Sequence, residues 1–383
     1  MQKNNEIIDM NVSIMYNSAC QITKYRRYNM NLKPLSEFAG NERKLLGIFG
    51  IDVGNHDTKT RHETFSSGYQ KVKVINKLSG EYIAFKDKYG DPVYYTFSNK
   101  PFNLSFNKTD SEEMFLITLM AIAREAVARG ISINGEEIAL AIGMPPGTYN
   151  QINIDKYYNY YMERGKNISY RYCCGERSYD FHFDVGNVVV SAQCWGAAAQ
   201  YPHLHREINE VYLVDIGGGT TDVLHMNSGQ IDGVPLSYND GVNKMFFTIA
   251  NTMTNETGIR FEAKNIKDAM MGKCELQEKY LDRIKELAYD WTKNIFSRMM
   301  TEGVEFRLTK VITLGGGSLI LDKEIEKVAK ELDFVERLAI KDSKANATGY
   351  ELVAARALYR IKSKTVNDFW RAFDVELSNK NVE

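Results

Sequence analysis

The chain has 383 residues and is almost electrically neutral, with 48 Lys and Arg residues against 49 Asp and Glu residues. A chain of this length is longer than a domain with one small hydrophobic core, so we predict two domains. Hydrophobic residues at 44% and charged residues at 25% are ordinary for a globular protein. The near-zero net charge argues against a nucleic-acid binder that acts through bulk positive charge, and we predict no direct contact with nucleic acid.

Cysteine usage and apolar runs indicate the compartment. The chain has five cysteines, Cys20, Cys173, Cys174, Cys194 and Cys274. They form no CxxC pair and no disulfide framework, which is typical of a reducing cytoplasm. The first thirty residues lack the apolar region of a secretory signal, and the longest apolar run, 114–123, is too short to span a bilayer. We therefore expect a cytoplasmic protein with no membrane partner.

Residues 1–45 differ from the rest of the chain, because they are polar, rich in Asn, Tyr and Arg, and show no sustained periodicity. We interpret this segment as a disordered extension, or as the product of an upstream start with the true beginning near Met30. The alternative is an arm that docks on a neighbouring molecule. Regular structure is expected from Leu46 onward.

From Leu46 on, hydrophobic patterns predict strands and helices that alternate in two successive sets. Strands are predicted at 48–51, within 69–97, at 138–142, within 168–192, at 211–214 and at 311–314. Helices are predicted at 114–127, 151–163, 196–201, through most of 240–300, at 322–332 and at 350–365. This alternation is an α/β plan.

One weak internal repeat supports two similar domains. Residues 51–59, Ile-Asp-Val-Gly-Asn-His-Asp-Thr-Lys, align with residues 214–222, Val-Asp-Ile-Gly-Gly-Gly-Thr-Thr-Asp. Each copy contains an apolar strand, an Asp, an apolar residue, a Gly and then small polar residues. Each domain is therefore expected to present the same kind of turn.

In the second copy, glycines join two strands. The strand 211–214 leads into Gly217, Gly218 and Gly219, and an alternating strand follows from Thr221, so we predict a β-hairpin. A Walker loop or a dinucleotide fingerprint needs a strand followed by a helix, with GKS, GKT or GxGxxG, and none of these occurs here. A glycine hairpin still suits phosphate, because its backbone approaches closely and successive N–H groups point at one anion.

Side chains around both hairpins extend this interpretation. Thr220 and Thr221 supply hydroxyl groups in the second hairpin. Asp215, at the strand end, is placed to hold Mg²⁺ through water, because Mg²⁺ prefers oxygen ligands and sheds water reluctantly.

The first copy offers the same features in Gly54, Asn55 and Thr58, and Asp52 mirrors the aspartate of the second copy. It adds Lys59, a point charge for phosphate oxygens. Two such hairpins facing each other would clamp a polyphosphate and its metal from both sides. The alternative for either copy alone is a plain hairpin turn.

A third glycine cluster follows the strand 311–314. It consists of Gly315, Gly316, Gly317 and Ser318, and it leads into a predicted helix start. Bare backbone there lets a flat group lie close, and a helix N-terminus tolerates negative charge.

The order of these three clusters resembles the actin superfamily, in which they form phosphate loop one, phosphate loop two and the adenosine loop. More narrowly, segments 141–147, 193–198 and 345–350 resemble the ParM-like bacterial and archaeal actins. The resemblance covers residues 46–365. The first loop departs from the family pattern at His56-Asp57, where the family more often has small or uncharged residues.

The resemblance implies an actin-like, ribonuclease H-like fold of two domains, with a nucleotide in the cleft between them. Domain I is expected at 46–192, closed by the helix 350–365, and domain II at 193–349. The third cluster would line the base and ribose. The expected activity is Mg²⁺-dependent hydrolysis of ATP or GTP.

In actin-like proteins a Gln or Glu at the position of Gln193 orients the attacking water. We expect Asp52 and Asp215 to organise Mg²⁺ through water. Hydrolysis needs mainly positioning and charge stabilisation, so one amide can matter. The alternative for Gln193 is a polar residue that caps the helix from Gly196.

The resemblance favours an ATPase that polymerises head to tail into filaments and segregates plasmid DNA through a DNA-bound adaptor protein. The alternatives are a non-polymerising ATPase of the sugar-kinase or chaperone type, and a nucleotide-binding structural subunit with little turnover. A chaperone needs a long substrate domain, but only about twenty residues follow the last predicted helix. Intact Asp52, Asp215 and Gln193 argue against the structural subunit.

Overall fold

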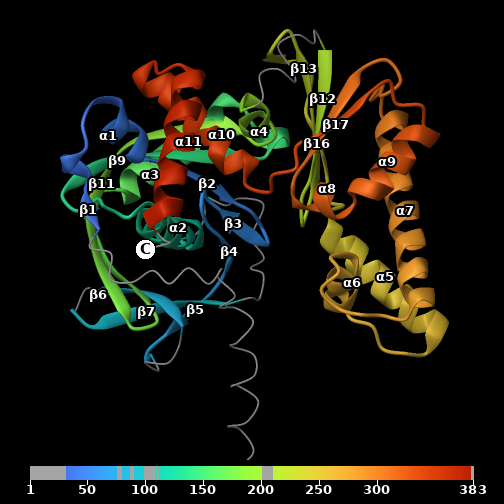
Figure 1. The fold of residues 1–383 in the computed structure, drawn as a ribbon, viewed down its shortest axis with the longest axis horizontal. Coiled ribbons are helices and arrows are strands. Elements are labelled where there is room, and N and C mark those ends of the chain that lie inside the picture. Colours follow the sequence, from blue (N-terminus) through green and yellow to red (C-terminus); the bar gives the residue numbers. More distant parts are fainter. Residues whose placement is uncertain are drawn as a thin grey trace, which may run out of the picture.

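The computed structural model describes residues 32–75, 80–86, 90–98, 109, 112–200 and 210–380. Two sheets, each with its own helices, lie side by side (Figure 1). Residues 1–31 of the predicted extension and Tyr201 of the predicted helix 196–201 lie outside the described residues. Among the helices that are described, none is both long and apolar enough to cross a bilayer.

The first sheet has nine described strands, in the order β4-β3-β2-β9-β11-β10-β6-β7-β5. Its centre is parallel and consists of β2 (Ile48–Val53), β9 (Glu136–Met144) and β11 (Arg177–Ala192). The flanking strands run antiparallel to their neighbours: β3 (Asp57–Lys59), β4 (Thr64–Ser66), β5 (Gly68–Val72), β6 (Glu81–Lys86), β7 (Pro92–Ser98) and β10 (Ile168–Cys174).

Helices pack against this sheet. They are α1 (Gly40–Leu46), α2 (Glu113–Arg129), α3 (Gln151–Arg164), α10 (Ala345–Tyr359) and α11 (Ser363–Lys380). The short turn η3 (Pro146–Thr148) follows β9 and contacts strands of the second sheet instead. Both α2 and α10 contact β2, and β2 is buried along its whole length. This burial explains why the sequence of β2 is a nearly continuous apolar run rather than an alternating one. The end of α2 is also as predicted, because Gly130 has a left-handed φ of 69°.

Ordered structure begins before residue 46. The additional elements are β1 (Lys33–Pro34), η1 (Leu35–Glu37) and β8 (Ile131–Ser132), and β1 pairs in parallel with β8. Leu35 and Leu45 are each 2% exposed and belong to the core of the first sheet. The prediction of an irregular extension over residues 1–45 is therefore wrong for residues 33–45. Isolated apolar anchors in a polar segment produce no periodicity, so the pattern does not reveal them.

The second sheet has six described strands, in the order β14-β13-β12-β16-β17, with β15 paired to β13. They are β12 (Glu210–Ile216), β13 (Thr221–Asn227), β14 (Gln230–Ile231), β15 (Leu236–Tyr238), β16 (Lys310–Leu314) and β17 (Arg337–Ala339). Its helices are α5 (Val242–Thr257), α6 (Ala263–Met270), α7 (Glu278–Thr301), α8 (Gly316–Ile320) and α9 (Asp322–Glu331). Strands β12, β16 and β17 are parallel, while β12 and β13 form an antiparallel hairpin. Both sheets thus combine a parallel part with a hairpin, and the predicted α/β class is confirmed.

Two helices cross where the sheets meet. α4 (Trp195–Ala199) packs with apolar residues of the second sheet, whereas α10 contacts β2 and β9 of the first. A Cβ atom added to Gly349 of α10 would collide with the carbonyl oxygen of Gly196 of α4, so this crossing requires glycine. The helix predicted at 350–365 is in fact two helices, α10 and α11, separated at Arg360, whose φ is 55°. After the second sheet, the chain therefore returns to the first (Figure 1).

Candidate functional site

Both predicted hairpins are present in the structure. In the first, Asp52 of β2 pairs across the strands with Lys59 of β3. In the second, Asp215 of β12 pairs with Asp222 of β13. Residues paired in this way lie on the same face of a hairpin. Lys59 therefore shares a face with Asp52, and the second hairpin places two carboxylates together.

The turns of the two hairpins lie opposite each other. A Cβ atom on Gly218 would lie 3.3 Å from the Cβ atom of His56, and one on Gly219 would lie 3.1 Å from Nδ2 of Asn55. The second turn thus has little space for a larger side chain. This arrangement is the one that a two-sided clamp for phosphate requires.

The start of α5 holds the second turn from behind. Three consecutive N–H groups, at residues 241–243, donate to the carbonyl oxygens of the three glycines of the turn at 3.0 to 3.1 Å. The N–H and C=O groups of a trans peptide point in opposite directions, so the N–H groups of Gly218, Gly219 and Thr220 point away from α5. Such an array of backbone N–H groups is suited to an anion.

Two buried carboxylates lie where β2 and β12 approach their ends. Asp52 is 5% exposed and Asp215 is 8% exposed. Gln193 donates from Nε2 to Oδ1 of Asp52 at 3.2 Å, and Asn346 donates from Nδ2 to Oδ2 of Asp215 at 3.0 Å. Gln193 precedes α4 and Asn346 belongs to α10. The crossing of these two helices therefore supplies one amide partner for each carboxylate.

Negative charge accumulates around Asp215. Burial raises the pKa of Asp215 to about 7, repulsion from Asp222 and Asp52 acts in the same direction, and the Asn346 hydrogen bond and Lys59 oppose it. A divalent cation would relieve this repulsion. The donor set is oxygen-rich, and Mg²⁺ commonly keeps several waters beside one or two carboxylates. The residues present therefore fit a Mg²⁺ ion held through water.

The third glycine cluster lies against the end of β12. Gly315 has a φ of 90°, and a Cβ atom there would collide with the carboxylate of Asp215. A Cβ atom on Gly317 would lie 2.7 Å from the β12 backbone, whereas one on Gly316 would meet no atom within 4 Å. The Ser318 hydroxyl donates to the carbonyl of Gly315 at 2.9 Å, so this side chain stabilises the turn itself.

Two of the predicted threonine hydroxyls have partners inside the protein. Thr58 and Thr221 are both 0% exposed. Thr58 Oγ1 lies 2.9 Å from Oγ of Ser67, and Thr221 Oγ1 donates to the carbonyl of Asp240 at 2.7 Å. These two side chains therefore hold the hairpins in shape.

The more accessible side chains among those predicted on the two hairpins are Asn55, Lys59 and Thr220. Asn55 is exposed, and Lys59 and Thr220 are half-buried. Thr220 also donates from Oγ1 to Oδ2 of Asp222 at 3.0 Å. These three side chains, together with the backbone N–H groups, are the ones best placed to meet a ligand.

The Gln193 side chain does not cap α4. No side chain caps this helix, which begins after Cys194, and the Gln193 amide points to Asp52 instead. The Gln193 backbone is fixed on both sides, since its N–H donates to the carbonyl of Met144 at 2.8 Å and its carbonyl accepts from Trp195 at 2.8 Å. The Gln193 side chain therefore lies beside Asp52 in the candidate site and does not cap α4.

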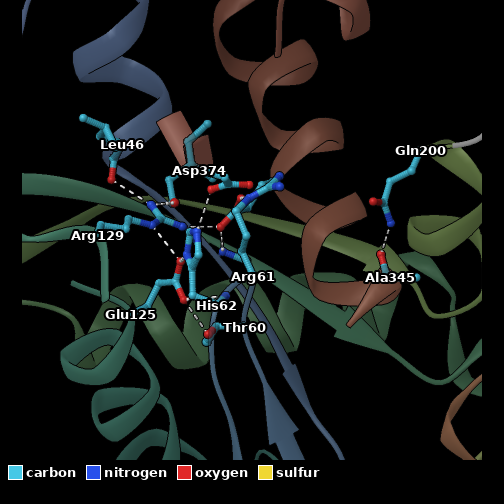
Figure 2. Close-up of polar contacts among 12 residues, drawn as sticks. Leu46, Thr60, Arg61, His62, Glu125, Arg129, Gln200, Ala345 and Asp374 are labelled. Carbon is cyan, nitrogen blue, oxygen red and sulfur yellow. Dashed lines mark hydrogen bonds and ion pairs between the residues drawn. The ribbon is translucent and has the colours of Figure 1, made fainter. Parts of the chain in front are cut away.

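A buried ion cluster, unforeseen in the sequence, adjoins the segment that follows the first hairpin, and of its members Asp374 is the most exposed, at 47% (Figure 2). It consists of His62, Glu125, Arg129, Glu351 and Asp374. His62 Nδ1 lies 2.6 Å from Oε1 of Glu125, and Nε2 lies 3.0 Å from Oδ1 of Asp374. Arg129 donates from Nε to Oε1 of Glu125 at 2.8 Å and also pairs with Glu351. The cluster therefore joins the segment after β3 to α2, α10 and α11.

Charge within this cluster is strongly stabilised. Burial alone would lower the pKa of His62, but Glu125 and Asp374 raise the pKa of His62 to about 9, so the ring is charged at neutral pH. Burial would raise the pKa of Glu125, but His62 and Arg129 hold that pKa well below its usual value. The sequence does contain one signal: Glu125 and Arg129 lie four residues apart in a largely apolar helix, where an isolated buried charge would be costly.

Comparisons with known proteins bear on the fold. Residues 213–327, less than a third of the chain, match the family described as archaeal actin homologue MreB-like, C-terminal. No curated protein matches the sequence.

Several solved structures resemble most of the chain. Ta0583, an archaeal actin homologue in complex with ADP, is 19% identical with a TM-score of 0.62, covering 81% of this chain and 99% of its own. The Alp12 filament structure is 13% identical with a TM-score of 0.56, covering 81% and 98%. ParM of Bacillus thuringiensis with ATP is 12% identical with a TM-score of 0.54, covering 80% and 97%. At these identities the likeness establishes the fold, and the predicted actin-like fold is confirmed.

Proposed function

We propose that this chain binds ATP with Mg²⁺ between its two hairpins and hydrolyses it. The observation that carries the proposal is the convergence of both glycine hairpins and the third glycine cluster on Asp52 and Asp215, with Gln193 bonded to Asp52. The ADP and ATP bound to Ta0583 and ParM support ATP as the ligand.

Each part of the site has a distinct role in this proposal. The N–H groups of the second turn and Lys59 bind phosphate oxygens, and the third glycine cluster lines the base and ribose. Asp52 and Asp215 organise Mg²⁺, which supplies positive charge to the phosphates. Gln193 donates from its N–H to Asp52, which leaves Oε1 free to accept from the attacking water. Orientation of this water and charge stabilisation are the main requirements of hydrolysis.

Nucleotide-dependent self-assembly completes the proposal. Leu308 is 80% exposed and Val335 is 54% exposed, and they follow Phe306 and Phe334 in two loops joined by the Val335 N–H bond to the Phe306 carbonyl at 3.0 Å. These loops precede β16 and β17, whereas α5 and α6 lie beyond the opposite ends of the strands, past α8 (Figure 1).

At this opposite end, Phe247 is 62% exposed beside a hollow of about 480 Å³ between α5 and α6. Two unlike surfaces at opposite ends, each with an exposed apolar side chain, suit a head-to-tail contact, and such a contact yields an open filament when it does not close into a ring. The Alp12 filament is a related assembly of the same fold. Within this proposal, the filament moves plasmid DNA through an adaptor protein.

The experiment is right-angle light scattering after Mg-ATP addition, with phosphate release followed in the same cuvette. A rise in scattering that decays as phosphate appears is the expected result. The Asp215→Ala variant should lose most turnover while keeping its far-UV circular dichroism, and Asp290→Ala, on the exposed face of α7, serves as the control.

The outcomes separate the alternatives. Full turnover in Asp215→Ala would refute the site. Phosphate release without scattering, over a wide protein concentration range, would favour a non-polymerising ATPase of the sugar-kinase or chaperone type. Nucleotide binding without phosphate release would favour the structural subunit.

A further inference from the structure

Asn346, in the first turn of α10, connects the two halves of the candidate site. Its side chain is nearly enclosed, with the residue 8% exposed. Oδ1 accepts from the N–H of Cys194 at 3.2 Å, and Nδ2 donates to Oδ2 of Asp215 at 3.0 Å. One amide thus holds both the residue next to Gln193 and the carboxylate of the second hairpin.

The backbone at Cys194 has an uncommon conformation that sets the direction of Gln193. Cys194 has φ 67° and ψ −53°, and the N–H of Trp195 donates to the carbonyl of Gln193 across it at 2.8 Å. These values describe a γ-turn of the rare, strained hand. Strain of this kind persists only where the surroundings hold it in place. The bond from the Cys194 N–H to Asn346 is such a restraint.

The position of Asn346 is itself fixed by the crossing of α4 and α10. The close approach of Gly349 to Gly196 leaves no space between the helices. One residue before Asn346, the carbonyl of Ala345 accepts a hydrogen bond from the Gln200 side chain at the end of α4 (Figure 2). A displacement of Asn346 would therefore disturb both helices, and its two hydrogen bonds have a stable frame.

We propose that Asn346 is a positioning residue for hydrolysis, which holds Gln193 and Asp215 in a fixed relation. It acts through these two residues and touches neither the nucleotide nor the attacking water. This inference rests on the proposed ATPase function. Residues that orient groups of a reactive site typically change activity by about 10- to 100-fold when removed. A shift of about 1 Å in the water-orienting group is enough to produce such a loss.

The first test compares Asn346→Ala with the wild-type chain. Turnover with Mg-ATP should fall by about 10- to 100-fold, while the dissociation constant of a fluorescent ATP analogue changes by less than about threefold, because the phosphate-binding backbone is intact. Thr348→Ala, a half-buried polar residue two positions along the same helix, is the control and should retain wild-type turnover. If Asn346→Ala unfolds, Asn346→Ser replaces it, since serine is too short to span both partners.

The decisive test removes Asn346 in a Gln193→Ala background. Because Asn346 acts in part through Gln193, the second substitution should lower turnover less than the same substitution does in the wild-type chain, since one of the two groups that it positions is already absent. Additive losses would overturn the proposal, and so would wild-type turnover in Asn346→Ala. If the wild-type chain binds ATP but releases no phosphate, the proposed ATPase function fails first and this inference fails with it.

Discussion

Deprotonation of His62 should weaken the fold at mildly alkaline pH. The pKa of His62 is raised from an ordinary value of 6.5 to about 9 by Glu125 and Asp374, although burial opposes the shift. A group with a raised folded-state pKa contributes stability that is fully present below the ordinary value and is lost as the pH rises through the folded value. The difference between the two values corresponds to about 3 kcal/mol of unfolding free energy. The side chains of His62 and Glu125 are 19% and 0% exposed, so solvent screens this pair little, whereas Asp374 is 47% exposed and contributes less.

The assay is urea unfolding at several pH values between 6 and 10, followed by tryptophan fluorescence. Trp370 is a suitable reporter, because its ring centroid lies 5.9 Å from that of His62. The unfolding free energy of the wild-type chain should fall by about 3 kcal/mol more across this range than that of His62→Gln, which cannot titrate. His182→Gln, an exposed histidine on β11, is the matched control and should follow the wild-type curve.

Parallel pH dependence in the wild-type chain and His62→Gln would refute the reasoning. It would mean that the charge of His62 is equally stable in the folded and unfolded chains. If His182→Gln lost the pH dependence to the same extent as His62→Gln, the reasoning would fail too, because the His182 side chain is exposed.

Three further predictions concern the site, the helix crossing and self-assembly. Gln193→Ala should slow phosphate release more than it weakens ATP binding and so prolong scattering; equal losses of both would contradict its role in orienting water. Gly349→Ala should lower the unfolding free energy by about 3 kcal/mol or more and so lower the melting temperature, because the added methyl group collides with the Gly196 backbone. Gly80→Ala is the control and should keep the wild-type melting temperature, because a Cβ atom there meets nothing within 4 Å. Leu308→Asp should raise the protein concentration needed for scattering by about tenfold or more while nucleotide binding is retained; unchanged scattering would remove this surface from the contact.

The hairpins were predictable because their information is local. A strand, an Asp and a glycine turn lie within about ten residues of each other in each copy, and short-range turn chemistry is enough to define them. The register follows from this turn, so the pairing of Asp215 with Asp222 could also have been deduced. The φ of 90° at Gly315 likewise agrees with a position that only glycine fills easily.

What the sequence left undetermined depends on contacts between distant segments. Asn346 meets Asp215 and Cys194 only because α10 returns to the first sheet. The hydrophobic periodicity of the sequence does not indicate this return. The buried ion cluster is similar, since His62 and Asp374 come from opposite ends of the chain. Only the pair formed by Glu125 and its neighbour four residues on was visible as a local pattern. The order of residues 33–45 was not predicted, because their few buried apolar residues form no periodic pattern.

The contact of Gly196 with Gly349 also constrains how the two sheets can move relative to each other. Backbone against backbone leaves no layer of side chains on which α4 and α10 could slide. A change in the angle between the sheets must therefore occur as a hinge about this point rather than as shear. Groups close to the axis move least in a rotation, and Gln193 lies three residues from Gly196. Loops far from the axis travel farthest, so opening the molecule to admit a ligand would displace the outer surfaces while the water-orienting amide stays nearly in place.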